Sequence, residues 1–167
     1  MATDQLILGS SIFDKWFCMA TITRFEDLEI WQLARKLSHD IYVKSQQGTF
    51  AKDFPLRDQI NSSSGSVSDN IAEGFERGEN KEFVQFLSFA KGSSGECRSQ
   101  VYRALDRGHI TTEAFDDLNE RLLLVARKIG SFMKYLQGSE VRGIKFRRGK
   151  IGSAQPETSN PKPEIGT

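Results

Sequence analysis

The sequence has few cysteines and histidines, the residues that build disulfide frameworks and many metal centres. Its 167 residues include two cysteines and two histidines. Cys18 and Cys97 lie far apart and outside any CxxC pair, which excludes a secreted disulfide framework and fits the reducing cytoplasm. No apolar run approaches the roughly 18 residues that cross a bilayer. We therefore expect a cytoplasmic protein with no membrane partner.

The common catalytic and cofactor-binding patterns are missing as well. Neither the phosphate-binding GxxxxGKS/T loop nor the dinucleotide-binding GxGxxG occurs. A di-iron bundle site needs two Glu-x-x-His pairs, and the nearest approach is a single Asp106-x-x-His109. Cys97 falls on an apolar stripe, which favours a buried small side chain over a nucleophile, and Ser66 has no neighbouring base. The sequence predicts no enzyme, no metal and no cofactor.

The length and composition are typical of one globular domain. Hydrophobic residues make up 38% and charged residues 27% of the chain, a balance that excludes wholesale disorder. The 23 Lys and Arg nearly cancel the 22 Asp and Glu, which leaves a net charge of +1. A nearly neutral total argues against a nucleic-acid partner unless the positive charge is concentrated in one segment.

Apolar residues recur at spacings of three and four, a pattern that predicts four helices. The core positions are Ile30, Ala34, Leu37 and Ile41; Leu56, Ile60, Val67 and Ile71; Phe83, Leu87, Ala90, Ser94, Cys97, Val101 and Leu105; and Phe115, Leu118, Leu122, Val125, Ile129, Phe132 and Leu136. This periodicity over several heptads indicates an all-α, up-down antiparallel four-helix bundle with short connections.

Capping residues predict where these helices begin and end. Thr23 and Glu26 have the spacing of a capping box at the first helix. The second helix is expected to begin near Pro55 and to end near Gly74 and Gly78. The third is expected to end at Gly108, and the fourth to run from Thr111 or Thr112 to Gly138. The serine-rich stretch 61–70 is assigned to the second helix because Ile60, Val67 and Ile71 keep helical phase through it.

The segments outside residues 23–138 differ from the expected bundle. Residues 1–22 are expected to be an N-terminal extension, with Met19 as an alternative start and a short docking helix as the competing interpretation. They make a poor signal peptide because no positive region precedes their apolar pieces. Residues 139–167 are expected to be a basic segment followed by a disordered end, in which three of the four prolines lie.

Three helices carry apolar residues away from their core stripe. An α-helix turns by about 100° per residue, and this rotation places the following residues away from the core stripe: Trp31 and Tyr42 on the first helix, Phe89 on the third, and Leu124 and Tyr135 on the fourth. Such residues can widen the core or be covered by the termini. Their recurrence on three helices favours a second buried surface, most simply a homo-oligomer interface.

The most specific string in the sequence is Asp69-Asn70-Ile71-Ala72-Glu73-Gly74-Phe75-Glu76-Arg77-Gly78, followed by Asn80-Lys81-Glu82-Phe83. Phe25-Glu26-Asp27-Leu28 and Trp31-Gln32 precede it, and Ala90-Lys91-Gly92-Ser93 and Glu96 follow it. With these residues the chain resembles, over residues 23–137, the bacterial four-helix-bundle family named for open reading frames in intervening sequences of the 23S ribosomal RNA gene.

The resemblance implies an up-down protomer that assembles as a homopentamer. A related branch is the accessory protein of diversity-generating retroelements, a basic pentamer that binds nucleic acid and a reverse transcriptase. RNA, DNA and a reverse transcriptase or another protein are therefore the partners that the resemblance implies. Most members have no established biochemical role.

The five motif residues Asn70, Ile71, Ala72, Glu73 and Gly74 also have a structural interpretation. Gly74 can close the helix in the left-handed conformation. A carboxylate at Glu73 opposes the helix dipole, so we expect a partner such as Arg77 or a basic residue of another helix. A structural network at this helix end is favoured over a ligand site.

Positive charge is concentrated after the bundle. Residues 24–137 carry 16 basic and 17 acidic side chains, whereas residues 142–150 carry five basic and no acidic side chain. An aromatic residue lies among these cations, and such a segment suits contact with phosphates and stacking on bases. The predicted nucleic-acid-binding residues are Arg142, Lys145, Phe146, Arg147, Arg148 and Lys150. The hypothesis is a non-enzymatic, oligomeric accessory factor that binds nucleic acid through this segment. The alternative is a protein-interaction scaffold that binds no nucleic acid.

Overall fold

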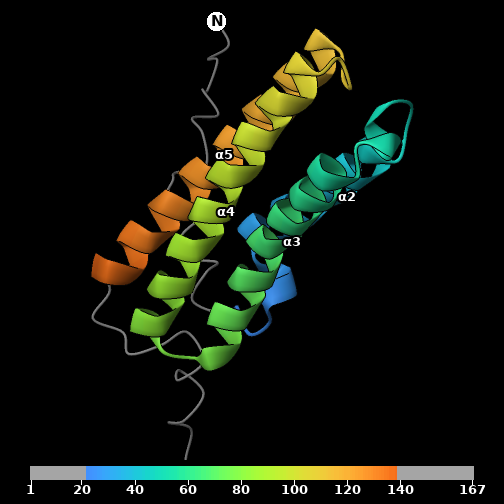
Figure 1. The fold of residues 1–167 in the computed structure, drawn as a ribbon. Helices are drawn as coiled ribbons and strands as arrows, with labels where there is room; N and C mark the ends of the chain where they lie inside the picture. The colour runs from blue at the N-terminus through green and yellow to red at the C-terminus, as the bar shows by residue number, and fades with distance from the viewer. Residues whose placement is uncertain (1–21, 139–167) are drawn as a thin grey trace, which may run out of the picture.

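The structure, a computed structural model of the chain, describes residues 22–138, and its regular elements there are all helical (Figure 1). In chain order they are the 3-10 helix η2 (Phe25–Asp27), α2 (Glu29–Ser45), the 3-10 helix η3 (Phe50–Lys52), α3 (Phe54–Arg77), α4 (Asn80–Asp106) and α5 (Thr112–Gly138). The prediction of four main helices in up-down order is confirmed. Apart from Ile22, the expected extension 1–22 and the expected tail 139–167 lie outside the described residues.

Each long helix packs against the next one along the chain, and α2 closes the bundle by contacting α5. Figure 1 shows α4 and α5 side by side and antiparallel, so that α5 ends near the first turns of α4. Two of the contacts between these helices illustrate the packing: the ring centroids of Phe83 and Phe132 lie 5.5 Å apart, and the Ser94 hydroxyl donates to the Leu122 carbonyl at 3.2 Å. Within residues 22–138 no helix is both long and apolar enough to span a bilayer.

The predicted apolar stripes form the core of the bundle. Every predicted core position is buried except Leu105, which is partly buried because Ala104 takes the inward position at the end of α4. Leu28, Phe50 and Phe75 join this core although the stripes did not include them. Leu28 and Phe50 precede α2 and α3, so residues of the connecting segments contribute to the core.

The first main helix begins later than the capping-box pattern predicts, so that prediction is wrong. Thr23 is not an N-cap: Arg24 precedes the 3-10 turn without a side-chain cap, and α2 begins only at Glu29. The Glu26 carboxylate accepts a hydrogen bond from the Arg24 guanidinium at 3.1 Å. Leu28 has an extended backbone and is 2% exposed, so burial of this side chain separates the turn from the helix.

The serine-rich stretch is helical, as predicted, because α3 runs through it without interruption. Its small polar side chains hydrogen-bond to both neighbouring helices: Ser64 with Ser38 of α2 at 3.2 Å, Asn61 with Ser45 of α2 at 3.1 Å, and Ser66 with Ser93 of α4 at 3.2 Å. Short side chains let the three helices approach closely while their hydroxyl groups keep hydrogen-bond partners.

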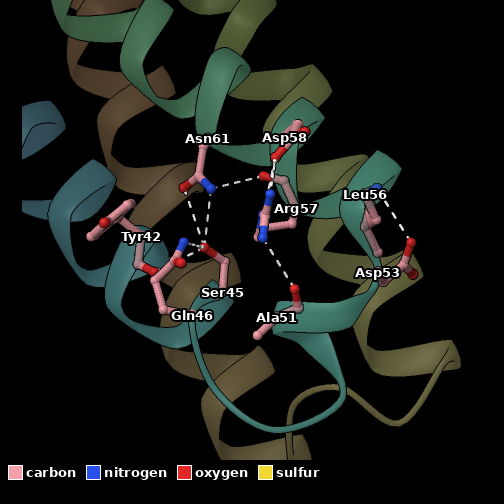
Figure 2. A network of polar contacts seen from close by, with 9 residues as sticks. All are labelled: Tyr42, Ser45, Gln46, Ala51, Asp53, Leu56, Arg57, Asp58 and Asn61. Atoms are coloured by element: carbon pink, nitrogen blue, oxygen red, sulfur yellow. Dashed lines mark hydrogen bonds and ion pairs between the residues drawn. The ribbon is translucent and has the colours of Figure 1, made fainter.

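Figure 2 shows how the chain turns from α2 into α3. The Asp53 carboxylate accepts the backbone N–H of Leu56 at 3.4 Å and caps α3, whose first turn contains Pro55 as predicted. The Arg57 guanidinium donates to a carbonyl of η3 at 3.1 Å, and the Asn61 side chain donates to the Arg57 carbonyl at 2.8 Å. These bonds fix the entry of α3 beside the end of α2.

Candidate functional site

The family-like motif lies at the end of α3, where the chain turns into α4. Gly74 does not close this helix, so the predicted left-handed Gly74 is wrong. The helix continues to Arg77, and Gly78 adopts the left-handed conformation with φ of 82°. The physical reason is Phe75, which is 2% exposed and packs edge-to-face on Phe83 with ring centroids 6.0 Å apart. Burying Phe75 keeps the chain helical for one more turn.

Gly74 instead lies where α4 crosses close to α3. A Cβ atom added to Gly74 would be 2.6 Å from the Phe86 Cβ and 2.8 Å from the Phe83 Cδ2. Both distances are shorter than any ordinary van der Waals contact, so a side chain at this position requires the two helices to separate. The glycine of the motif is therefore needed for packing between helices.

The prediction of a partner for Glu73 is confirmed. The Arg77 guanidinium donates to the Glu73 carboxylate at 2.8 Å, one helical turn away, and lies 3.9 Å from the Glu82 carboxylate at the start of α4. The same guanidinium lies 4.7 Å from the ring centroid of Phe86. The hydrogen bond to Glu73 raises the pKa of Arg77 above its ordinary value. These contacts connect the end of α3 to the first turns of α4.

The remaining motif residues also have structural roles. The Asn70 side chain donates to the Ser66 carbonyl at 2.7 Å and to its hydroxyl at 3.0 Å, which is the hydroxyl that meets Ser93 of α4. Ile71 is fully buried in the core, and Ala72 is partly buried. The motif residues therefore form a corner at which α3 packs against α4.

Cys97 is a buried core residue, as predicted. Its side chain is 0% exposed, and burial raises the pKa of the thiol to about 12. Beside it, Ser63 donates to the Gln100 side chain, which in turn donates to Glu96 at 3.1 Å. A thiol that is both inaccessible and protonated near neutral pH is a poor nucleophile.

A polar cluster joins the α2–α3 and α4–α5 connections. The Asp53 carboxylate pairs with Arg107 at 2.6 Å and with the His109 Nε2 at 2.9 Å, while the His109 Nδ1 lies 2.8 Å from the Thr49 hydroxyl. The His109 ring also stacks on Phe50 with centroids 5.1 Å apart. His109 therefore belongs to this structural cluster, and Asp53 serves both as helix cap and as the link between the two connections.

Replacing Asp53 with asparagine is expected to lower stability at neutral pH and to have a smaller effect in acid. Hydrogen bonds from Arg107 and His109 lower the pKa of Asp53 from 3.8 to about 2. A carboxylate with a lowered folded-state pKa stabilises the protein fully above about pH 5, and this stabilisation is lost as the pH falls toward 2. Asparagine keeps the capping oxygen, so the difference measures the charge.

Urea denaturation of both proteins at pH 6 and at pH 3 measures this effect. Asp69→Asn is the matched control, because Asp69 is exposed and forms no ion pair within the described residues. A midpoint difference for Asp53→Asn that is the same at both pH values would contradict the proposed charge contribution.

Two further features of the described residues bear on what the bundle could hold. No group of three or more His, Cys, Asp or Glu side chains within residues 22–138 is placed to hold a metal ion. A cavity of about 10 Å³ in the middle of the bundle is lined by Leu37, Ser64, Ser94 and neighbouring apolar side chains, and it has room for one water molecule at most. It is too small for a substrate.

The five predicted interface residues do not share one environment. Trp31 packs against the monomer's own core and lies edge-to-face on Phe25 at 5.1 Å, so it widens the core. Leu124 is partly buried. Tyr42, Phe89 and Tyr135 are 53%, 49% and 39% exposed. These three side chains lie on three different helices and remain the candidates for an oligomer interface.

The predicted nucleic-acid-binding residues Arg142, Lys145, Phe146, Arg147, Arg148 and Lys150 lie outside the described residues. What the structure gives is the point from which that segment leaves the bundle. The basic segment begins four residues after α5 ends at Gly138, near the first turns of α4 (Figure 1). The segment is therefore attached at the end of the bundle that carries the motif corner.

Comparisons with known proteins agree with this fold. The profile of the 23S rRNA-intervening sequence protein family matches residues 26–131. A crystal structure of a protein of unknown function from the S23 ribosomal protein family of Bacteroides thetaiotaomicron is similar, with a TM-score of 0.58 and 19% identity over 63% of this chain and 98% of that chain. No curated protein matches the sequence. Because the family profile spans all four helices of the bundle, the chain belongs to the 23S rRNA-intervening sequence protein family.

Proposed function

We propose that this chain is a non-enzymatic, oligomeric accessory protein that binds RNA or DNA through its basic segment 142–150. The observation that carries the proposal is the separation of charge along the chain. Residues 24–137 hold 16 basic and 17 acidic side chains, whereas residues 142–150 hold five basic and no acidic side chain. Positive charge available to phosphates is thereby concentrated in one segment, where each neutralised phosphate releases counterions.

The position of the segment supports this proposal. Arg142 is four residues after Gly138, and a fully extended chain covers at most about 3.6 Å per residue. The first cation, Arg142, is therefore held within roughly 14 Å of the bundle's end, and the last, Lys150, within roughly 43 Å. Phe146, between Lys145 and Arg147, adds an aromatic surface on which an unpaired base can stack.

Assembly would strengthen such weak contacts. We propose a homopentamer, on the grounds of the family resemblance and of the exposed aromatic side chains Tyr42, Phe89 and Tyr135. Five copies would place about 25 cations on one particle, and linked weak sites gain affinity through effective concentration. Native mass spectrometry measures the stoichiometry directly, and a monomer at micromolar concentration would contradict this part of the proposal.

A salt titration of full-length protein tests the nucleic-acid role. The variant replaces Arg142, Lys145, Arg147, Arg148 and Lys150 with glutamine, and binding to a fluorescent 30-nucleotide RNA is followed by anisotropy. Removal of five phosphate contacts is expected to reduce the slope of log K against log salt by about 3.5–4.5. Binding that is unchanged in the variant, or absent from the wild type at low salt, would overturn the proposal.

The second candidate function is a scaffold that binds another protein, such as a reverse transcriptase, without binding nucleic acid. The observation in its favour is the set of large apolar side chains exposed on the described bundle: Tyr42, Val43, Phe54, Phe89, Tyr102 and Tyr135. Isolated exposed apolar residues are common on monomers, so a contiguous patch would be needed to distinguish a docking surface. Absence of RNA and DNA binding at low salt would favour this function.

A further inference from the structure

Positive side chains of the bundle differ in whether they have an acidic partner. On the side of α5 that faces α2, Arg121 bonds to Asp40 at 2.6 Å and to Asp117 at 3.1 Å, and Lys128 bonds to Glu29 at 2.9 Å. These cations are neutralised within the protomer. They are therefore poor candidates for binding an external anion.

The cations on the side of α5 that faces α4 are different. Lys91 of α4 and Arg127 and Lys134 of α5 are exposed, and none forms an ion pair or hydrogen bond within residues 22–138. The Lys91 Nζ would lie 3.8 Å from a Cβ added to Gly130, so this ammonium lies over Gly130. Arg127 is three residues before Gly130 and Lys134 is four residues after it, which places both on the same helix face one turn away.

Lys91, Arg127 and Lys134 thus surround Gly130, and we call them the Gly130 cation cluster. No acidic residue lies three or four positions from any of the three in the sequence, where a helix would offer an intrahelical partner. On the same face of α5 the nearest acid is Glu120, seven residues before Arg127 and therefore about 10 Å further along the helix. Three positive charges without an acidic partner therefore lie close together on a bundle whose net charge is −1.

Several exposed neighbours of the cluster are small and uncharged. One turn from Lys91, α4 carries Ser88 and Gly95, and α5 carries Ser131 between Arg127 and Lys134. Short side chains at these positions limit steric hindrance to an extended polyanion that contacts the three cations. Arg127 and Lys134 are seven residues apart, about 10.5 Å along the axis, a length over which one strand of a stacked helix presents about three phosphates.

We propose that the Gly130 cation cluster is a second binding site for the phosphate backbone of a nucleic acid, on the face of the bundle between α4 and α5. The inference rests on the proposed nucleic-acid function and extends it from the tail to the folded domain. α5 leads from the cluster to Gly138 and the basic segment, so one strand can contact both sites (Figure 1). The small neutral side chains around the cluster make few specific contacts with base edges, so binding does not depend on the nucleotide sequence.

Two sets of full-length variants test this site, again with the fluorescent 30-nucleotide RNA. Replacement of Lys91, Arg127 and Lys134 by glutamine removes three contacts and is expected to lower the salt slope by about 2–3. Lys36, Lys44 and Lys52, replaced together by glutamine, are the control with the same net charge but a different location. Their replacement is expected to leave the slope within error of the wild type.

Gly130 provides a test that removes no cation. Gly130→Glu places a carboxylate one turn from both α5 cations, where it pairs with them, and is expected to weaken binding at least tenfold at low salt. Gly130→Ala has nothing closer than the Lys91 Nζ at 3.8 Å and is expected to bind like the wild type. Both replacements favour the helix over glycine, so circular dichroism should show both variants folded.

The outcomes separate this inference from the proposed function. If the five-glutamine tail variant loses affinity while the cluster variant behaves like its lysine control, the cluster site is wrong and the tail function stands. If the cluster variant alone loses affinity, the cluster binds and the tail assignment fails. If poly-L-glutamate of equal charge displaces the RNA as well as unlabelled RNA does, the site recognises acidic protein and the proposal is overturned. If the wild type does not bind RNA or DNA at low salt, both proposals fail.

Discussion

Replacing Gly74 with alanine is expected to lower the free energy of unfolding by about 1–3 kcal/mol, the usual cost of inserting a methyl group into a fully packed contact. The added Cβ would lie 2.6 Å from the Phe86 Cβ and 2.8 Å from the Phe83 Cδ2. The position of a Cβ atom is fixed by the backbone, so no rotation of Phe86 relieves the first overlap. The overlap must be relieved by moving α3 away from α4, which loosens the contacts around Phe75 and Phe83.

This destabilisation is the opposite of the ordinary effect of the substitution. Alanine in a helix interior is favoured over glycine by roughly 0.5–1 kcal/mol because glycine loses more backbone entropy on folding. Gly92→Ala is the matched control: Gly92 is an exposed residue of α4, and a Cβ there would meet nothing within 4 Å. We expect this control to gain stability while Gly74→Ala loses it.

Urea denaturation at equal protein concentration measures both changes, since association with further copies would make stability depend on concentration. If Gly74→Ala is as stable as Gly92→Ala, the close approach of α3 and α4 at this position is wrong. Gly74→Ser would sharpen the comparison, because its hydroxyl adds volume and is expected to destabilise at least as much as alanine.

Replacing Phe83 with alanine is expected to have the largest effect on stability, a loss of about 3–5 kcal/mol. Phe83 is 2% exposed and lies edge-to-face on Phe75 of α3, with ring centroids 6.0 Å apart, and on Phe132 of α5 at 5.5 Å. One ring therefore joins three helices. Its removal leaves a cavity that none of the three can fill without losing contacts elsewhere.

Phe54→Ala is the matched control for this prediction. Phe54 is 59% exposed at the start of α3, and its described ring contact is the Arg57 guanidinium at 4.7 Å. A cation–π contact at an exposed site contributes about 0.5–1 kcal/mol, so this variant is expected to lose no more than that. Thermal unfolding by circular dichroism compares the two, and equal losses would contradict the central position of Phe83.

The fold was largely predictable because the spacing of apolar residues along the chain indicates each helix. The apolar residues of α3, α4 and α5 recur at spacings of three and four, and burial follows those stripes from Leu56 to Leu136. Helical phase also placed residues 61–70 correctly in α3 despite their low helix propensity. Tertiary contacts override local propensity in that stretch, because its serines hydrogen-bond to α2 and α4.

Predictions that depended on a single end residue were less reliable. The capping box at Thr23 was wrong because Leu28 is drawn into the core and interrupts the helix. The left-handed Gly74 was wrong because burial of Phe75 extends α3 to Arg77 and passes that role to Gly78. In both cases a buried side chain, whose partners lie elsewhere in the sequence, decided where a helix begins or ends.

The sequence by itself determined the four helices, their up-down order, the burial of Cys97 and the need for a partner at Glu73, since each depends on spacing within one helix or on short connections. Only the tertiary structure decided that Gly74 lies under α4, that Asp53 links two distant connections, and that Lys91 lies over Gly130 between Arg127 and Lys134. These features depend on which faces of two helices meet and at what register. Spacing within one helix does not contain that information.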